Sequence, residues 1–337
     1  MAHRPLGDEE AVLPASIVKD MRRLMRVSED DNECRYYLIT HESLRGRFET
    51  NLKQFELSSP VDARIAFSDH GEYIEFGDTS QSMSDVGNLG KFLSLCCELN
   101  TLAFDQAGLG MPQWVLLNLA LAPSALLVAA VQPGKLRSIA RRQADPRRWK
   151  LEALLDRAIA CDHAGRVPIA AYCAAPTAEP SRWFGWSASS LLEHQGFILK
   201  GLALGAYRPT VLNGIAQYGD AAALKMHVKF GPMRIRNPSL LGVHELPGSF
   251  FYEWIPYYAT VPSLGTLVED ARTDPARDSR SPRQSSLIDW SAIIADPAFR
   301  VRMEREIHSS AAVYYVVPES WCDDTLMSPV PPIYKIW

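Results

Sequence analysis

The feature that most restricts the fold of this chain is an alternation of strand-like and helix-like segments between residues 167 and 255. The run Val-Pro-Ile-Ala-Ala-Tyr-Cys at 167–173 is short and apolar, which predicts a buried strand. After it we expect, in order, a helix at 187–207, a strand at 210–216, a helix at 220–230 and two strands at 233–246 and 249–255. Strands that alternate with helices form a sheet with helices laid on it, so the sequence predicts a mixed α/β (α+β) fold.

The length and composition fit a globular chain with more than one folding unit. Its 337 residues are more than one compact core usually holds, and a hydrophobic content of 47% is ample for a buried interior. The formal net charge of −4 gives no positive field, so we expect neither nucleic acid nor an anionic membrane surface as a partner. The six cysteines form no Cys-x-x-Cys motif and no secretory signal opens the sequence, which predicts reduced thiols and a cytoplasmic location.

The segment 114–131 is long and apolar enough to resemble a membrane span, because none of its 18 residues is charged. It contains Asn118 and Pro123, which are tolerated where two strands are joined by a turn. We therefore predict two buried strands of about seven residues here and no membrane insertion.

The rest of the chain gives weaker patterns. They predict helices at 16–26, 86–104, 149–160 and 289–307, strands at 34–40 and 311–317, and a hairpin with strands at 63–67 and 72–76. Residues 135–148 form a polar, arginine-rich stretch, and 269–286 are expected to be a mobile, charged linker or surface loop. The predicted regions are an N-terminal α+β region at 1–110, a core at 111–262, and a linker with a C-terminal helix–strand extension at 263–337.

The predicted helix at 220–230 carries the most specific pattern in the chain. It reads Asp-Ala-Ala-Ala-Leu-Lys-Met-His-Val-Lys-Phe and is followed by Gly231. This resembles the final helix of the GCN5-related N-acetyltransferases, Asn-x-x-Ala-x-x-x-Tyr-x-Lys-x-Gly-Phe, with Ala223, Lys229 and Gly231 in register and His227 in place of the tyrosine. The resemblance extends over 167–255 and implies a mixed, mostly antiparallel sheet flanked by helices, with additions at both ends.

The same resemblance implies an acyltransferase that moves an acyl group from a coenzyme A or carrier-protein thioester to the amine of a small molecule. In the family the tyrosine protonates the departing thiolate, and a histidine can take that role because its pKa lies near neutrality. His227 is therefore the predicted general acid. Tyr172, Asn213 and Gln217 are the residues that we expect to help remove the proton of the amine. The expected partners are a small-molecule acceptor and, where it supplies the thioester, a carrier protein.

The family binds the pyrophosphate of the cofactor at a Gly-rich loop between a strand and the next helix, where backbone N–H groups and the helix dipole point at the anion. Residues 180–187 correspond to that loop, with one glycine in place of two, and the residues expected to bind the cofactor are Arg182, Gly185, Trp186 and Ser187. A second candidate for the phosphate loop, Glu193-x-x-Gly196, falls inside the predicted helix. A third, the basic stretch at 135–137, follows an apolar strand, but no matching helix motif follows it.

Two rival interpretations stay open. A noncatalytic ligand-binding or assembly module would use the same scaffold, and the incomplete phosphate loop is consistent with it. An enzyme of different chemistry is the other, with Cys173 as nucleophile and His194 as its base. Cys161-x-His163 is the one close pair of typical metal-ligand residues in the sequence, and no His-Glu-x-x-His motif or second pair completes a site, so we predict no metal.

Overall fold

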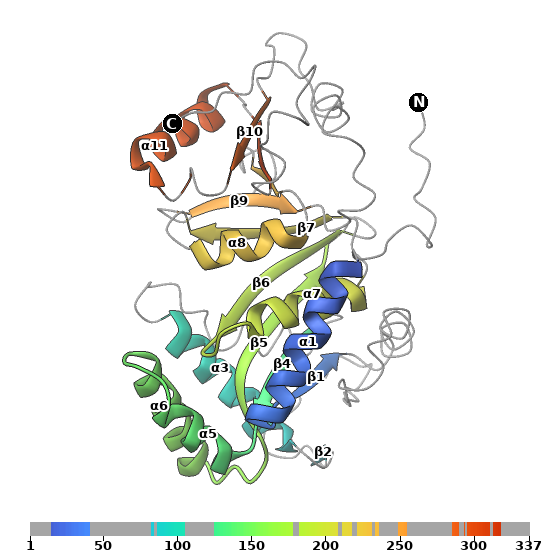
Figure 1. The fold of residues 1–337 in the computed structure, drawn as a ribbon, viewed down its shortest axis with the longest axis vertical. Helices are drawn as coiled ribbons and strands as arrows, with labels where there is room; N and C mark the ends of the chain where they lie inside the picture. The colour runs from blue at the N-terminus through green and yellow to red at the C-terminus, as the bar shows by residue number, and fades with distance from the viewer. Residues whose placement is uncertain are drawn as a thin grey trace. The chain divides into compact units, whose positions relative to one another are not determined.

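The computed structural model describes residues 15–40, 82–83, 86–104, 125–177, 182–207, 211–217, 221–230, 233–235, 249–254, 285–289, 293, 295–310 and 313–317 (Figure 1). The chain forms two compact units, one of Val18–Arg208 and one of Met1–Ile17 with Pro209–Trp337. The region boundaries predicted near residues 110 and 262 both lie outside the described residues. The division into three regions therefore stays a prediction.

The unit Val18–Arg208 is built on an antiparallel sheet. Its described strands are, in spatial order, β1 (Arg35–Thr40), β4 (Ala125–Val131), β5 (Val167–Pro176) and β6 (Arg182–Ser190). The strands predicted at 34–40 and 167–173 are confirmed, and so is the second strand of the apolar segment 114–131. The first strand of that segment lies outside the described residues. Burial of every side chain in β4 from Leu126 onward explains its unbroken apolar sequence.

Helices lie on both faces of this sheet. They are α1 (Ala15–Asn32), α3 (Leu89–Phe104), α5 (Pro133–Arg141), α6 (Arg147–Ala160) and α7 (Gln195–Tyr207). Lys200 of α7 lies over the ring of Tyr172 in β5, whereas Cys96 and Cys97 of α3 lie near the next residue, Cys173. Because successive strand residues face opposite sides, α7 and α3 cover opposite faces. Every residue of α7 except Gly196 is buried, Gln195 and Lys200 included, so the helix is enclosed on all sides.

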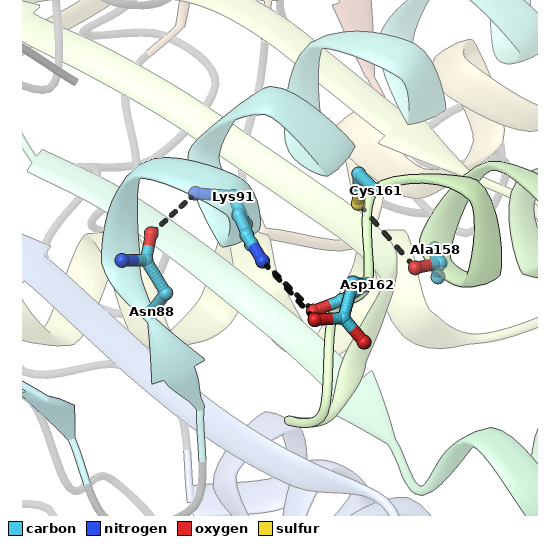
Figure 2. Close-up of polar contacts among 5 residues, drawn as sticks. All are labelled: Asn88, Lys91, Ala158, Cys161 and Asp162. Carbon is cyan, nitrogen blue, oxygen red and sulfur yellow. Dashed lines mark hydrogen bonds and ion pairs between the residues drawn. The ribbon is translucent and has the colours of Figure 1, made fainter. Parts of the chain in front are cut away.

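The start of α3 is fixed by polar contacts (Figure 2). It follows the short strands β2 (Ser82–Met83) and β3 (Gly87–Asn88), and Oδ1 of Asn88 accepts a hydrogen bond at 3.0 Å from the backbone N–H of Lys91, the contact typical of an N-cap. Nζ of Lys91 donates to the carbonyl oxygen of Asp162 at 2.9 Å and lies 3.9 Å from its carboxylate. These contacts tie α3 to the turn after α6.

One prediction for this unit is wrong, and one stretch without a predicted element contains a helix. The helix expected from Ser187 begins only at Gln195, because residues 182–190 pair with β5 as strand β6. The polar stretch 135–148 contains helix α5, in which Leu136 and Ile139 are buried and the arginines lie on the exposed side. The helices predicted at 16–26, 86–104 and 149–160 are confirmed as α1, α3 and α6.

The unit that contains Pro209–Trp337 is also built on paired strands. Its described strands are, in spatial order, β7 (Val211–Gln217), β9 (Ser249–Trp254), β8 (Met233–Ile235), β11 (Val313–Val317) and β10 (Ser285–Asp289). The pairs β7/β9, β9/β8 and β8/β11 are antiparallel and β10/β11 is parallel. Within the described residues the fold is thus a mixed α/β fold with a mostly antiparallel sheet flanked by helices, as predicted.

Two described helices of this unit contact the same face of its sheet. α8 (Ala221–Phe230) contacts Tyr252 of β9 through His227, and α11 (Pro297–Ser310) contacts Tyr314 of β11 through Phe299. Tyr252 and Tyr314 are both paired with Ile235 in one row across the strands. Side chains in one row share a face of the sheet.

Several boundaries differ from prediction or fall outside the description. The helix predicted at 289–307 is α11, which starts eight residues later than expected because residue 289 ends β10. Residues 285–286 belong to β10 and not to the predicted linker, whose other residues lie outside the described ranges, as does the predicted hairpin at 63–76. In the part of the chain that is described, no helix is long and apolar enough to span a membrane.

Candidate functional site

His227 is the predicted acid, and the structure gives it two hydrogen-bond partners. It lies on the inner side of α8 and only 4% of its surface is exposed. Its Nδ1 is 2.5 Å from the carbonyl oxygen of Ala223, one turn earlier in the helix. Its Nε2 is 2.6 Å from the hydroxyl oxygen of Tyr252, and the two rings meet edge to face at 89°.

These contacts assign the protons of the pair. A carbonyl oxygen can only accept, so Nδ1 of His227 carries a hydrogen and donates it to Ala223. In the neutral imidazole Nε2 is then an acceptor. Burial raises the pKa of Tyr252 above its usual range, so its hydroxyl is protonated at neutral pH and donates to Nε2. The pair is therefore a phenol that donates to an imidazole.

Gly214 makes room for this tyrosine. It lies directly opposite Tyr252 in the β7/β9 pair. A Cβ atom at Gly214 would lie 2.6 Å from Cζ of Tyr252 and would overlap its hydroxyl oxygen. A glycine inside a strand often marks the close approach of another group, and here that group is the phenol of the pair.

The predicted proton acceptors belong to β7 and to the other compact unit. Asn213 precedes Gly214 in β7, so its side chain is on the opposite face from Tyr252, where its buried Oδ1 has no hydrogen-bond partner among the described residues. Gln217 is the last residue of β7. Tyr172 belongs to the other compact unit, where it is buried under α7. Their predicted roles remain predictions.

A buried ion pair lies in the same row as Asn213. Glu253, which is opposite Asn213 in β9, has no exposed surface, and its Oε2 accepts hydrogen bonds from Nε and Nη2 of Arg234 at 2.6 and 2.5 Å. Sequence analysis missed this pair. The sequence places Arg234 and Glu253 in two neighbouring predicted strands, which is a sign of a possible ion pair. Only the strand register shows that the two residues face each other.

The residues predicted to bind the cofactor lie in a strand and not in a loop. All four belong to β6: Arg182, Gly185, Trp186 and Ser187. The next helix, α7, begins only at Gln195. The hydroxyl of Ser187 accepts a hydrogen bond at 2.7 Å from Asn100 of α3, and Trp186 is 48% exposed. Ser187 does not begin a helix, because its backbone is paired with β5.

The second candidate for the phosphate loop, Glu193-x-x-Gly196, begins in the turn between β6 and α7. It therefore lies at the start of a helix and not inside one. Glu193 pairs with Arg147 of α6 at 3.1 Å, and His194 has a φ of 64°. The side chain of Gln195 is buried, where it accepts a hydrogen bond from the hydroxyl of Tyr36 and donates one to that of Ser28.

The cysteine and metal hypotheses receive no supporting geometry. Burial raises the pKa of the Cys173 thiol to about 12, which keeps it protonated at neutral pH. The thiol of Cys161 donates to the carbonyl of Ala158, and Nε2 of His163 donates to the carbonyl of Arg166. Among the residues that the structure describes, no three His, Cys, Asp or Glu side chains are grouped so that they could hold a metal ion.

Known proteins resemble this chain distantly. No protein-family model and no curated protein matches it. Nourseothricin acetyltransferase is a solved structure similar to it, with 14% sequence identity and a TM-score of 0.25, over 40% of this chain and 65% of that protein. The chain thus spans less than two thirds of the length of that enzyme. At this level of similarity, neither its acceptor nor its chemistry transfers to the present protein.

Proposed function

We propose that this protein is an N-acyltransferase that moves an acyl group from the thioester of coenzyme A or of a carrier protein to the amine of a small molecule. The observation that carries the proposal is the hydrogen-bonded pair of His227 and Tyr252. His227 occupies the position in α8 at which the acetyltransferases that this helix resembles carry their acid. The order β5, α7, β7, α8, β8, β9, with β6 inserted after β5, agrees with the same resemblance.

Aminolysis of a thioester needs a group that handles one proton. The neutral amine attacks the carbonyl carbon, a C–N bond forms, the C–S bond breaks, and the proton lost by nitrogen must reach sulfur. An imidazole can accept and return a proton near neutral pH. In His227 that nitrogen is Nε2, since Nδ1–H is committed to the carbonyl of Ala223.

Arg182, Gly185, Trp186 and Ser187 of β6 remain our proposed contacts for the cofactor. They belong to the unit Val18–Arg208 and His227 to the other unit, so the cofactor contacts and the acid are separate parts of the proposal.

A noncatalytic ligand-binding or assembly module is the second candidate, and the burial of the pair favours it. His227 and Tyr252 are 4% and 5% exposed, and both ring nitrogens of the histidine have protein partners. Residues that only hold α8 against β9 would look the same. Such a module would bind a thioester or another ligand without turning it over.

Thermal stability measured with acetyl-, malonyl- and long-chain acyl-coenzyme A and with an acylated carrier protein tests donor binding. A ligand at a hundredfold excess over its Kd stabilises the folded state by about 2.7 kcal/mol, so binding raises the melting temperature. Release of free thiol on addition of a panel of small amines then tests transfer. Binding with amine-dependent thiol release supports the acyltransferase. Binding without release supports the module, and no shift with any donor contradicts the proposal.

A further inference from the structure

The positive charge of the chain is concentrated in two neighbouring helices. Residues 133–160, which contain α5 and α6, hold eight basic and three acidic residues, a net charge of +5. The whole chain has a net charge of −4, so the rest of it carries −9. The average charge of the chain thus conceals a local positive field on one part of the unit Val18–Arg208.

α5 presents basic side chains to solvent without neutralising them. Arg137 and Arg141 are exposed and lie one turn apart, on the side of the helix opposite its buried residues. No acidic residue occurs in 132–144, and neither arginine has an ion pair within the described part of the chain. Arg142, at the end of the helix, is also exposed and donates to the neutral amide oxygen of Asn32 at 3.1 Å. The charges of these arginines are available to an incoming partner.

α6 adds an exposed tryptophan to this basic face. Trp149 is 53% exposed and lies in the first turn, on the side opposite the buried leucines of the helix. Arg148, beside it, is exposed and pairs with Glu152 at 2.9 Å. α5 and α6 pack against each other (Figure 1). We call their exposed arginines and tryptophan the α5–α6 surface, which consists of Arg137, Arg141, Arg142, Arg148 and Trp149.

These residue types favour a folded protein as the partner of the α5–α6 surface. Arginine and tryptophan are enriched in the interfaces between proteins, whereas lysine is depleted there. Glu152 and Asp156 follow Trp149 one and two turns along α6, and their charges would repel a phosphate backbone or an anionic bilayer. A folded protein can instead place acidic groups opposite the arginines and other groups opposite the two carboxylates. The surface therefore fits a protein with a mostly acidic face.

We propose that this partner is the carrier protein that brings the acyl thioester, bound to the α5–α6 surface through its acidic face. The inference rests on the proposed function and deepens it, because it selects a carrier protein over coenzyme A as the bearer of the acyl group. Arg147, at the start of α6, pairs at 3.1 Å with Glu193, which lies three residues after the end of β6. The α5–α6 surface thus adjoins the turn that follows the strand of the proposed cofactor contacts, within one compact unit.

The test measures the dissociation constant between the full chain and an acidic acyl carrier protein loaded with an acyl group. Arg137→Glu/Arg141→Glu should weaken binding by about tenfold or more, because like charges then face each other. Trp149→Ala should also weaken it by about tenfold or more, as expected for an aromatic residue at the centre of an interface. All three side chains are exposed, so the melting temperature of the free protein should stay nearly unchanged.

α1 supplies a matched control. Lys19→Glu/Arg23→Glu also reverses two exposed basic residues one turn apart in a helix, and it changes the net charge by the same amount. Both residues lie at the end of α1 far from Asn32 and hence from α5. The control should leave the dissociation constant within about twofold, because distant surface charges are screened.

Equal effects of the two double variants, whether large or absent, would overturn the inference, because binding would then not depend on the α5–α6 surface. A wild type that does not bind the carrier protein, but binds duplex DNA or vesicles of anionic lipid through Arg137 and Arg141, would also overturn it. Amine-dependent thiol release from acyl-coenzyme A would in either case leave the acyltransferase standing. Carrier binding that depends on the surface, with no thiol released from any donor, would confirm the docking and contradict the proposed function.

Discussion

The two compact units bury polar side chains in different ways. In the unit Val18–Arg208, neutral side chains join a helix to a strand in the contacts of Asn100 in α3 with the hydroxyls of Ser187 and Ser189, and the buried basic residues His163 and Arg166 bond to backbone carbonyls. In the unit with Pro209–Trp337, the described interior holds groups that carry or exchange charge, the Arg234–Glu253 ion pair and the His227–Tyr252 pair. Neutral hydrogen bonds fix geometry, whereas titratable pairs can also move protons, so we place the proton chemistry in the second unit.

Breaking the ion pair should have the largest effect on stability. Glu253→Gln removes the buried carboxylate that binds the half-buried guanidinium of Arg234, and the loss of one partner of a buried pair costs about 3–5 kcal/mol. The control is Glu193→Gln, which breaks an exposed pair with Arg147 and should cost about 1 kcal/mol or less. Urea unfolding measures both. Similar losses for the two variants would show that the buried charge is not what distinguishes the second unit.

Lys200, in the unit Val18–Arg208, allows a matching test. Replacing it should change stability less than breaking the ion pair does, and in the opposite direction. Burial lowers the pKa of Lys200 well below its usual value of 10.5, so over that range of pH the unfolded chain binds a proton that the folded chain does not. Stability is therefore lost as the pH falls below 10.5 toward the folded pKa. Lys200→Met removes this cost and keeps the length of the side chain.

We expect Lys200→Met to raise the melting temperature at pH 7 by roughly 2–4 °C, the shift that about 1 kcal/mol produces in a unit of this size. The advantage should shrink as the pH approaches 10.5, where the wild-type lysine loses its proton in both states. A fall in melting temperature would mean that the contacts of the amine outweigh the cost of burying it.

Local patterns predict the parts of this fold that depend on local forces. The apolar run of β5 and the apolar spacing of α6 indicate their structures without any partner. Strand β6 was missed because its Ser- and Gly-containing sequence becomes a strand by pairing with β5. The turn after it contains neither glycine nor proline, and His194 takes the left-handed conformation itself, so no residue type marks where α7 begins.

The candidate site was predictable in part for a similar reason. The motif of α8 singles out His227, because the pattern lies within one helix. Its partner Tyr252 is 25 residues away in β9, and only the register of β7 with β9 places that tyrosine opposite Gly214. The same register turns Asn213 to the other face. A one-residue slip would exchange these faces, which is why no sequence pattern alone could choose between the two residues.

The most direct test of the central claim is the acyl-transfer rate constant of His227→Phe, measured in single turnover with saturating donor. His163→Phe is the control, since it removes another buried histidine, whose Nε2 donates to the carbonyl of Arg166. If the pair on α8 and β9 carries the proton, His227→Phe lowers the rate constant by about a hundredfold with donor binding retained, and His163→Phe does not. A folded His227→Phe protein that transfers the acyl group at the wild-type rate would contradict the account and leave His227 as a packing residue.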